Sequence, residues 1–183
     1  MGRLIYATIM SLDGFIADEN GNFDWAAPDE EVHRFVNELV RPVGTYLYGR
    51  RMYETMVYWE TEGDDSDIGR DYAKTWRAVD KIIYSRTLEK TSSARTRIEH
   101  DFDVEAVRRM KATADRDLAV GGPELAGHAL RAGLIDELHI FIVPVLVGAG
   151  NRALRADGKV MLRLSEERRF SNGTIFLRFT VDR

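Results

Sequence analysis

The chain has 183 residues and carries 26 Lys and Arg against 30 Asp and Glu, which gives a formal net charge of −4. This length predicts a single domain, residues 1–183, and the hydrophobic share of 44% with a charged share of 31% is typical of a soluble globular fold. The absence of cysteine excludes disulfides and thiolate metal sites, and the mildly acidic balance gives no electrostatic reason to bind nucleic acid or anionic lipid.

The sequence shows no targeting or membrane-spanning pattern. Leu4 to Leu12 is apolar and follows Arg3, but this segment ends at Asp13 without a signal-peptide cleavage site. The longest uncharged run, 140–151, is far shorter than the roughly 20 residues that span a bilayer. We therefore expect a cytoplasmic protein without a membrane partner.

The first third predicts a strand, a turn and an amphipathic helix. Arg3 to Met10 forms an apolar strand that Asp13-Gly14 closes, and Asn20-Gly21 indicates a hairpin-like turn. A helix should run from Pro28 to Pro42. Its buried face follows the helical spacing of Val32, Phe35, Val36, Leu39 and Val40.

The middle of the chain alternates short strands with helices. The strands are expected at 45–48, 81–84, 95–99 and 118–120, and the helices at 50–58, 68–79, 103–112 and 123–132. Asp64, Asp65 and Asp67 lie before the second of these helices. We interpret them as a solvated capping loop, because the glycine and the distant glutamate of a calcium loop are missing.

The last third has the character of an antiparallel edge. A long strand, Glu137 to Val147, is interrupted by Pro144 and followed by a loop from Gly148 to Gly158. Two strands, 160–170 and 174–181, then form a hairpin. Together these elements predict an α/β fold with a mostly parallel mixed sheet, flanking helices and a terminal β-hairpin.

Three predicted strands end in glycine or small polar residues at the start of a helix or turn. They are followed by Gly49-Arg50-Arg51-Met52, by Ser85-Arg86-Thr87 and by Gly121-Gly122-Pro123-Glu124. Ligands bind at the carboxyl ends of strands in open α/β sheets, and a helix N-terminus there suits phosphate. The three segments together predict a phosphate-rich cofactor along one sheet edge.

The order of several motifs resembles the dihydrofolate reductase-like superfamily. The similarity is to the branch of the riboflavin-biosynthesis deaminase–reductase C-terminal (reductase) domain and its stand-alone relatives, and it covers essentially the whole chain. The motifs that carry it are 11–17 (SLDGFIA), 48–54 (YGRRMYE), 120–125 (VGGPEL), 133–138 (GLIDEL) and 144–150 (PVLVGAG).

This resemblance implies NADPH as the cofactor. By resemblance, Gly49, Arg50, Arg51 and Met52 receive cofactor phosphates. The pyrophosphate site is implied for Gly121, Gly122, Pro123, Glu124 and Leu125. Ala7 and Ile16 border the nicotinamide, and Ser85 and Arg86 match the 2′-phosphate site. A Cβ at Gly122 should therefore weaken cofactor binding while hardly changing the melting temperature.

Substrate residues are harder to assign. Asp13 is the catalytic candidate beside the implied nicotinamide site, although it also fits a plain Asp-Gly turn. Glu30 stands where folate-reducing relatives place their pterin-binding carboxylate, but Asp29 and Glu31 leave the register open, and three acids at a helix start also compensate its dipole. Trp25 either lines the pocket or anchors a lid.

Other constellations are weaker. The segment 148–153 fits the Rossmann pattern G-x-G-x-x-A, but no long βαβ unit follows it, so we interpret it as a turn or subunit contact. His33, His100, His128 and His139 show no metal-ligand spacing, and no metal site is expected.

The sequence therefore predicts an NADPH-dependent reductase that transfers hydride to a small heterocyclic or sugar-derived substrate. The implied substrates are pterin-like or similar to 5-amino-6-(5-phosphoribosylamino)uracil. The alternative is a catalytically inactive NADP(H)-binding regulatory module of the same fold. The apolar strand near 139–147 with Pro144 indicates an edge that a second copy covers. We expect a homodimer through Ile140 to Gly150 and part of the final hairpin.

Overall fold

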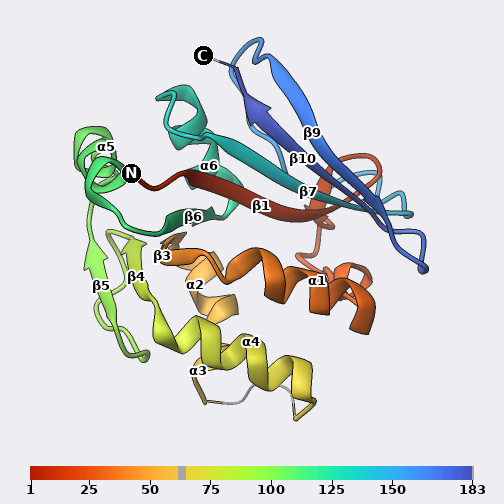
Figure 1. The fold of residues 1–183 in the computed structure, drawn as a ribbon, viewed down its shortest axis with the longest axis horizontal. Helices are drawn as coiled ribbons and strands as arrows, with labels where there is room; N and C mark the ends of the chain where they lie inside the picture. The colour runs from red at the N-terminus through yellow and green to blue at the C-terminus, as the bar shows by residue number, and fades with distance from the viewer. Residues whose placement is uncertain (62–64, 183) are drawn as a thin grey trace.

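The computed structural model describes residues 1–61 and 65–182. An eight-stranded mixed sheet forms the centre, with strand order β5-β4-β3-β6-β1-β7-β10-β9 (Figure 1). Strands β5, β4, β3, β6, β1 and β7 run parallel, and β10 and β9 pair antiparallel at one edge. The α/β class, the mostly parallel sheet and the antiparallel terminal hairpin are therefore confirmed.

The strands of the main sheet are β1 (Leu4–Ser11), β3 (Val43–Gly49), β4 (Asp80–Tyr84), β5 (Thr96–Glu99), β6 (Asp117–Gly121), β7 (Glu137–Val143), β9 (Leu162–Arg169) and β10 (Ile175–Val181). Two short strands, β2 (Phe15–Ala17) and β8 (Asn151–Arg152), pair antiparallel in a separate sheet. The helices are η1 (Asp24–Ala26), α1 (Glu30–Val40), α2 (Arg50–Met56), α3 (Tyr58–Thr61), α4 (Asp67–Ala78), α5 (Val104–Thr113) and α6 (Pro123–Arg131).

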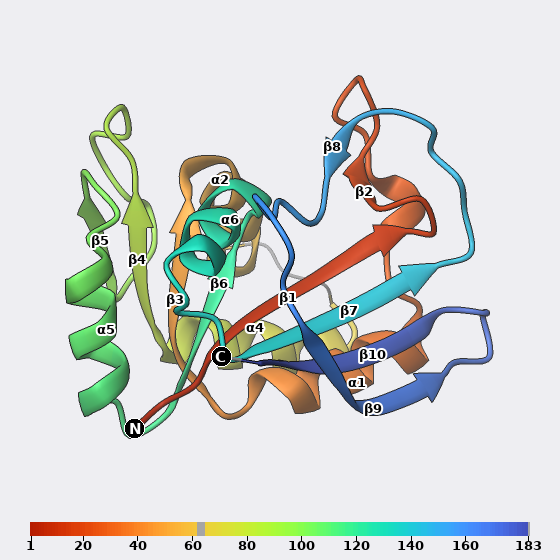
Figure 2. The same cartoon turned by 90° about the horizontal axis from the view of Figure 1, so that it is seen from above.

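Helices cover the two faces of the sheet unequally. Helices α5 and α6 pack their apolar residues on β1, β6 and β7 from one side. On the other side, α4 packs on β3 and β4, while Val32 and Phe35 of α1 pack against Phe141, Phe170 and Phe176. Seen from above, no helix lies over the outer face of β9 and β10 in the described part of the chain (Figure 2). The hairpin thus carries one uncovered face.

Several boundaries differ from the sequence expectations, and the expected helix 50–58 is divided into α2 and α3. Helix α1 begins at Glu30 rather than Pro28, because the Asp29 carboxylate accepts the Val32 N–H at 2.9 Å and caps the helix. Strand β7 ends at Val143 instead of running through Pro144 to Val147, since proline cannot donate to the ladder. The expected loop 148–158 contains β8.

The turn at Asn20-Gly21 is present, but the strand before it has a different pairing partner from the one expected. The Asp18 N–H donates to the Asn22 carbonyl at 2.9 Å, so the chain does turn there. The strand before it pairs with β8 and not with residues around Phe23.

Of the expected acidic capping loop, Asp64 lies outside the described residues, and Ser66 accepts the Gly69 N–H as the N-cap of α4. Within the described chain, no helix is both long and apolar enough to cross a membrane.

Candidate active site

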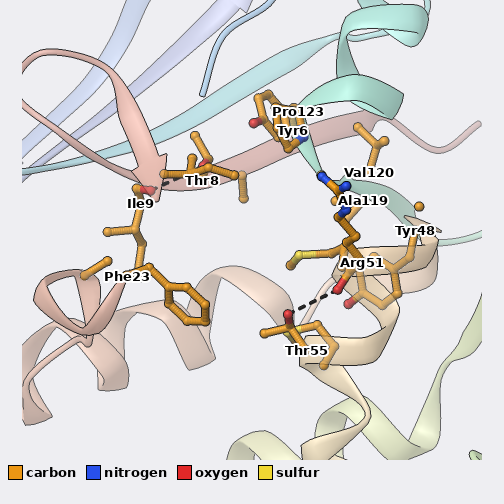
Figure 3. Close-up of a pocket in the computed structure, with 18 of the residues that line it drawn as sticks. Tyr6, Thr8, Ile9, Phe23, Tyr48, Arg51, Thr55, Ala119, Val120 and Pro123 are labelled. Carbon is orange, nitrogen blue, oxygen red and sulfur yellow. Dashed lines mark hydrogen bonds between the residues drawn. The ribbon is translucent and has the colours of Figure 1, made fainter. Parts of the chain in front are cut away.

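The sheet splits at its centre. Strand β1 pairs with β6 only over Leu4, Ile5 and Tyr6, but it continues to pair with β7 from Ile5 to Ser11. Residues 7–9 therefore have one edge without a β6 partner. This edge borders a cleft of about 2000 Å³ (Figure 3). Drug-sized ligands occupy pockets of roughly 300–1,000 Å³, so the cleft has room for an extended ligand and a second small one.

Two helix starts meet at the inner end of this cleft. Strand β3 ends at Gly49 before α2, and β6 ends at Gly121 before α6. Tyr48 and Gly121 are register partners, so the two strand ends are adjacent. The N-caps, Gly49 and Gly122, provide no side chain to bind the first-turn N–H groups. Those donors and the two helix dipoles are available to an anion.

The three glycines have different structural roles. Gly122 has φ +94°, a conformation that L side chains rarely adopt. A Cβ on Gly121 would lie 2.7 Å from Cδ1 of Tyr48 and 3.0 Å from Cγ of Met52. Gly49 has an ordinary φ of −74°, and a Cβ there would meet nothing within 4 Å. The expectation that Gly122→Ala leaves the melting temperature nearly unchanged is therefore wrong.

Two arginines of α2 line the cleft, and they differ in their hydrogen-bond and ion-pair partners. Arg50 donates from Nε to Glu54 at 2.7 Å and from Nη1 to the Thr87 hydroxyl at 2.9 Å, so it reaches the turn after β4. Arg51 forms no ion pair with any described residue. Its side chain extends toward Val120 and Pro123, beside the start of α6 (Figure 3). Arg51 is thus an uncommitted cation next to both helix starts.

The turn after β4 lies beside the cleft rather than in its lining. The buried Ser85 hydroxyl accepts the N–H groups of Thr87 at 3.2 Å and Leu88 at 3.0 Å, so it holds the turn. Arg86 is exposed and donates from Nε to Asp101 at 2.9 Å. An exposed ion pair of this kind contributes about 0–1 kcal/mol and leaves the guanidinium available to another anion.

The other residues implied for cofactor binding come together in the structure. The cleft lining includes, from that set, Ala7, Ile16, Gly49, Arg50, Arg51, Met52, Gly121, Gly122, Pro123, Glu124 and Leu125. Ser85 and Arg86 do not belong to it. Four segments of the sequence, at residues 7, 16, 49–52 and 121–125, therefore contribute to one concave surface.

Asp13 connects two loops instead of reaching into the cleft. Its carboxylate accepts the N–H groups of Val147 at 3.1 Å and Gly148 at 2.7 Å, and the Ser11 hydroxyl donates to it at 2.6 Å. The Ser11 hydrogen bond, with these backbone donors, lowers the pKa of Asp13 to about 2. Asp13 is outside the cleft lining, so this carboxylate holds the segment before β2 against the segment after β7.

The acids at the start of α1 are also committed elsewhere. Glu30 is exposed and pairs with Arg34 at 2.8 Å, one turn along the helix. Glu31 accepts the Ser171 hydroxyl at 2.6 Å and the Ser171 N–H at 3.0 Å. Glu30 does not line the cleft, which places the expected carboxylate position in solvent.

Trp25 lines a small pocket of about 120 Å³ that shares Ile9 and Pro28 with the large cleft. The other side of this pocket is formed by Asn172 and Thr174 at the hairpin turn. The indole N–H of Trp25 is buried and has no hydrogen-bond partner in the described structure. A buried donor of this kind favours a polar ligand or water beside it.

Two histidines that were not predicted as site residues line the cleft. His33 on α1 lies with its ring centroid 5.7 Å from that of Tyr72, and His139 on β7 is the register partner of Ala7. Burial lowers the pKa of His139 despite its hydrogen bond to Glu137. The available signal was a pair of polar residues, Glu137 and His139, inside an otherwise apolar strand. In the described ranges 1–61 and 65–182, no group of three His, Asp or Glu could hold a metal ion.

The architecture is that of the dihydrofolate reductase-like fold. The chain superposes on dihydrofolate reductase from Enterococcus faecalis, complexed with NADP(H), with a TM-score of 0.68, 14% identity and coverage of 100% of this chain and 98% of that one. The family model of the RibD C-terminal domain matches residues 3–176. The chain therefore belongs to the RibD C-terminal domain family.

Relatives of different kinds share this fold. YyaP, an uncharacterized protein of Bacillus subtilis (strain 168), is 28% identical over 176 residues, which cover 94% of this chain and 92% of YyaP. A pyrimidine reductase-like protein from Corynebacterium diphtheriae has a TM-score of 0.72 and 17% identity, with coverage of 100% and 92%. For the diaminohydroxyphosphoribosylaminopyrimidine deaminase/5-amino-6-(5-phosphoribosylamino)uracil reductase from Thermotoga maritima, the TM-score is 0.70 at 17% identity. The match covers 99% of this chain but only 57% of that protein.

The position of Asp13 generates a stability prediction. Asp13→Asn should lower the melting temperature at pH 7, because an amide accepts the two backbone N–H groups less strongly than a carboxylate. A lowered folded-state pKa stabilises the fold above the ordinary pKa near 4, and this contribution is lost as the pH falls toward 2. The difference between variant and wild type should therefore shrink from pH 4 to pH 2 in thermal unfolding. Glu30→Gln is the control and should change stability by less than about 0.5 kcal/mol; an equal effect of the two substitutions would contradict the loop contact.

Proposed function

We propose that this chain is an NADPH-dependent reductase. Its substrate would be a small heterocyclic or sugar-derived molecule with a carbonyl or imine, pterin-like or similar to 5-amino-6-(5-phosphoribosylamino)uracil. Membership of the RibD C-terminal domain family supports a reductase, and the Enterococcus and Thermotoga proteins carry NADP(H) and a reductase activity in their names. The observation that carries the proposal is the pair of adjacent, uncapped helix starts beside the unpaired edge of β1.

The residues present fit a dinucleotide. Its pyrophosphate would lie across the first-turn N–H groups of α2 and α6, and Arg51 would neutralise part of its charge. At Gly122 the lack of a side chain would let the pyrophosphate approach the backbone closely. The missing Cβ of Gly121 makes room for Tyr48 and Met52. Ala7 follows Tyr6, the last residue that pairs with β6, so the nicotinamide would lie along the free edge of β1.

Selectivity for NADPH would come from the turn after β4. Arg86 is exposed and only loosely paired with Asp101, and Arg50 reaches Thr87 in the same turn. Ser85 would contribute by fixing the turn, since its hydroxyl already accepts two backbone N–H groups. Two guanidinium groups at this place would favour a 2′-phosphate over a 2′-hydroxyl.

The protein would orient the reactants and exclude water. When bound, the dihydronicotinamide supplies the hydride. Ile16 on β2 would cover the reactive ring, and Asp13 would keep β2 in place through the loop that leads to β8. Asp13 would then be a positioning residue. Trp25 would offer its buried indole N–H to a polar group in the small pocket that adjoins the cleft at Ile9 and Pro28.

One observation supports a second candidate function, a module that binds NADP(H) without turnover. Neither Asp13, the catalytic candidate, nor Glu30, a substrate-binding candidate, lines the cleft, and both carboxylates are committed to other contacts. This favours the alternative of a module that binds NADP(H) without turnover. An absorbance assay at 340 nm with pterins, ribosylaminopyrimidines and simple ketones separates the two. Binding without oxidation of NADPH would support the regulatory module.

We further propose a homodimer. On the hairpin face that no helix covers, Leu162 and Leu164 are the register partners of the half-buried Val181 and Phe179, and Leu164 is 47% exposed. Leu146, in the region after β7, is 72% exposed. A second copy would cover both areas through a symmetric contact, since large exposed apolar patches are rare on monomers.

The cofactor proposal predicts a separation between binding and stability at Gly49. Gly49→Ala should raise the NADPH dissociation constant at least tenfold, because its methyl group projects where the phosphates approach. The free energy of unfolding should change by less than about 1 kcal/mol, because φ −74° suits alanine but alanine is a poorer N-cap than glycine. Fluorescence titration and thermal unfolding measure the two effects. Gly122→Ala is the contrast and should lose about 1–3 kcal/mol through its positive φ. Unchanged NADPH affinity in Gly49→Ala would count against a phosphate at this helix start.

A second prediction concerns cofactor choice. Arg86→Ala should weaken NADPH binding by about 1.5–3 kcal/mol, the value of a hydrogen bond to a charged group, and leave NADH binding unchanged. The preference for NADPH should therefore narrow at least tenfold in parallel titrations. Arg108→Ala removes an exposed arginine paired within α5 and serves as the control. Equal discrimination before and after the Arg86 change would remove this residue from the site.

The dimer is tested by sedimentation at micromolar concentration. Wild type should sediment as twice the 20.9 kDa chain. Leu164→Glu should produce monomers, because it places a charge in the apolar contact. Arg163→Glu changes the opposite face of the same strand and should remain dimeric. A single 20.9 kDa wild-type species that does not associate on concentration would refute the dimer.

A further inference from the structure

His139 is a buried histidine in the lining of the cleft, and it has no role in the cofactor contacts proposed for this site. It belongs to β7, is only 4% exposed, and is the parallel register partner of Ala7. Register partners in a parallel pair project their side chains on the same face of the sheet. The rings of His139 and Phe176 lie 5.8 Å apart in an edge-to-face arrangement. His139 thus lies one strand away from the free edge of β1.

The imidazole is oriented by a carboxylate. Nε2 of His139 lies 2.9 Å from Oε2 of Glu137. Oε1 of Glu137 accepts a hydrogen bond from Nη1 of Arg3 at 2.7 Å. Arg3 also binds Asp117. The Glu137 carboxylate favours the neutral tautomer that carries its proton on Nε2, which leaves Nδ1 unprotonated in that tautomer. Nδ1 has no hydrogen-bond partner among the described residues, and it is not fully buried.

We propose that His139 is the proton donor of the reduction, with Glu137 as its positioning residue. This inference rests on the proposed reductase function. The substrate carbon gains the hydride and its electron pair from the dihydronicotinamide, which becomes oxidised. The π pair of the C=O or C=N bond becomes the new O–H or N–H bond with the proton from Nδ1 of the imidazolium. The neutral imidazole then regains a proton from solvent, so atoms and charge balance.

Charged groups on every neighbouring element determine when His139 is protonated. Glu137 on β7 favours the imidazolium, while Arg178 on β10 and Arg3 before β1 oppose it. Glu166 on β9 pairs with Arg178, Asp117 on β6 pairs with Arg3, and α1 contributes His33 to the cleft lining. Burial is the largest influence and lowers the pKa of His139. Reduction should therefore be fastest at acid pH and decline as the pH rises through this value.

The ligand-free protein permits a first test by nitrogen-15 NMR of its histidines, assigned with His139→Phe. The His139 signal should show the Nε2–H tautomer when neutral and a midpoint below 6.5. Glu137→Gln should move this midpoint to lower pH and Arg178→Gln to higher pH. Addition of NADP⁺ should shift the His139 signal. A His139 resonance that NADP⁺ leaves unchanged would mean a histidine sealed in the core, and it would overturn the proposal.

Kinetics with the best substrate of the panel provide the second test. His139→Phe and His139→Gln should lower kcat by about 10²–10⁴-fold, as loss of a general acid does, with an unchanged NADPH dissociation constant. The decline in rate with rising pH should disappear in both variants and move to lower pH in Glu137→Gln. His100→Gln, an exposed histidine outside the cleft, should behave as wild type.

The outcomes distinguish this inference from the proposed function. Wild type that neither binds nor oxidises NADPH would contradict the reductase itself. Wild-type turnover with kcat and pH profile retained in His139→Gln would contradict only the role of His139. If wild type binds NADPH but reduces no substrate of the panel, the NMR experiment alone tests His139. A shift of its signal with NADP⁺ supports the proposal, and an unchanged signal overturns it.

Discussion

The separation of β1 from β6 after Tyr6 determines how this molecule can bind a ligand. Up to Tyr6, the hydrogen bonds of β1 are shared between β6 and β7; beyond it, β1 follows β7 alone. A continuous sheet would have no gap at this point. Because the split occurs where β3 and β6 also end, an unpaired strand edge and two helix N-termini border the same cleft.

The walls of the cleft depend on contacts distant in the sequence. Asp13 binds the N–H groups of Val147 and Gly148, and β2 pairs with β8. A Cβ on Gly150 would lie 2.1 Å from the Ala17 carbonyl oxygen, so the two segments touch closely there. The segment 148–153 that imitates a dinucleotide-binding fingerprint is therefore a wall of the cleft. Its glycine permits close packing of two loops.

Much of the fold, and the sheet edge where β3 and β6 end in glycine before a helix, could be predicted from the sequence, because local patterns encode them. Helical spacing in 32–40 and glycines before α2 and α6 are local signals. The roles of Asp13, Glu30 and Ser85 could not be predicted, since each depends on a partner: loop N–H groups, Arg34 with solvent, and a turn that the hydroxyl itself holds. His139 was missed because its importance comes from Glu137 beside it and Ala7 across the strand pair.

A crystal structure of the chain with NADP⁺ would test the central claim most directly. We expect the pyrophosphate across the first turns of α2 and α6 with Arg51 beside it, the adenosine 2′-phosphate toward Arg86, and the nicotinamide along Ala7 within reach of His139. A dinucleotide bound at another surface, or a cleft that remains empty at millimolar NADP⁺, would contradict it.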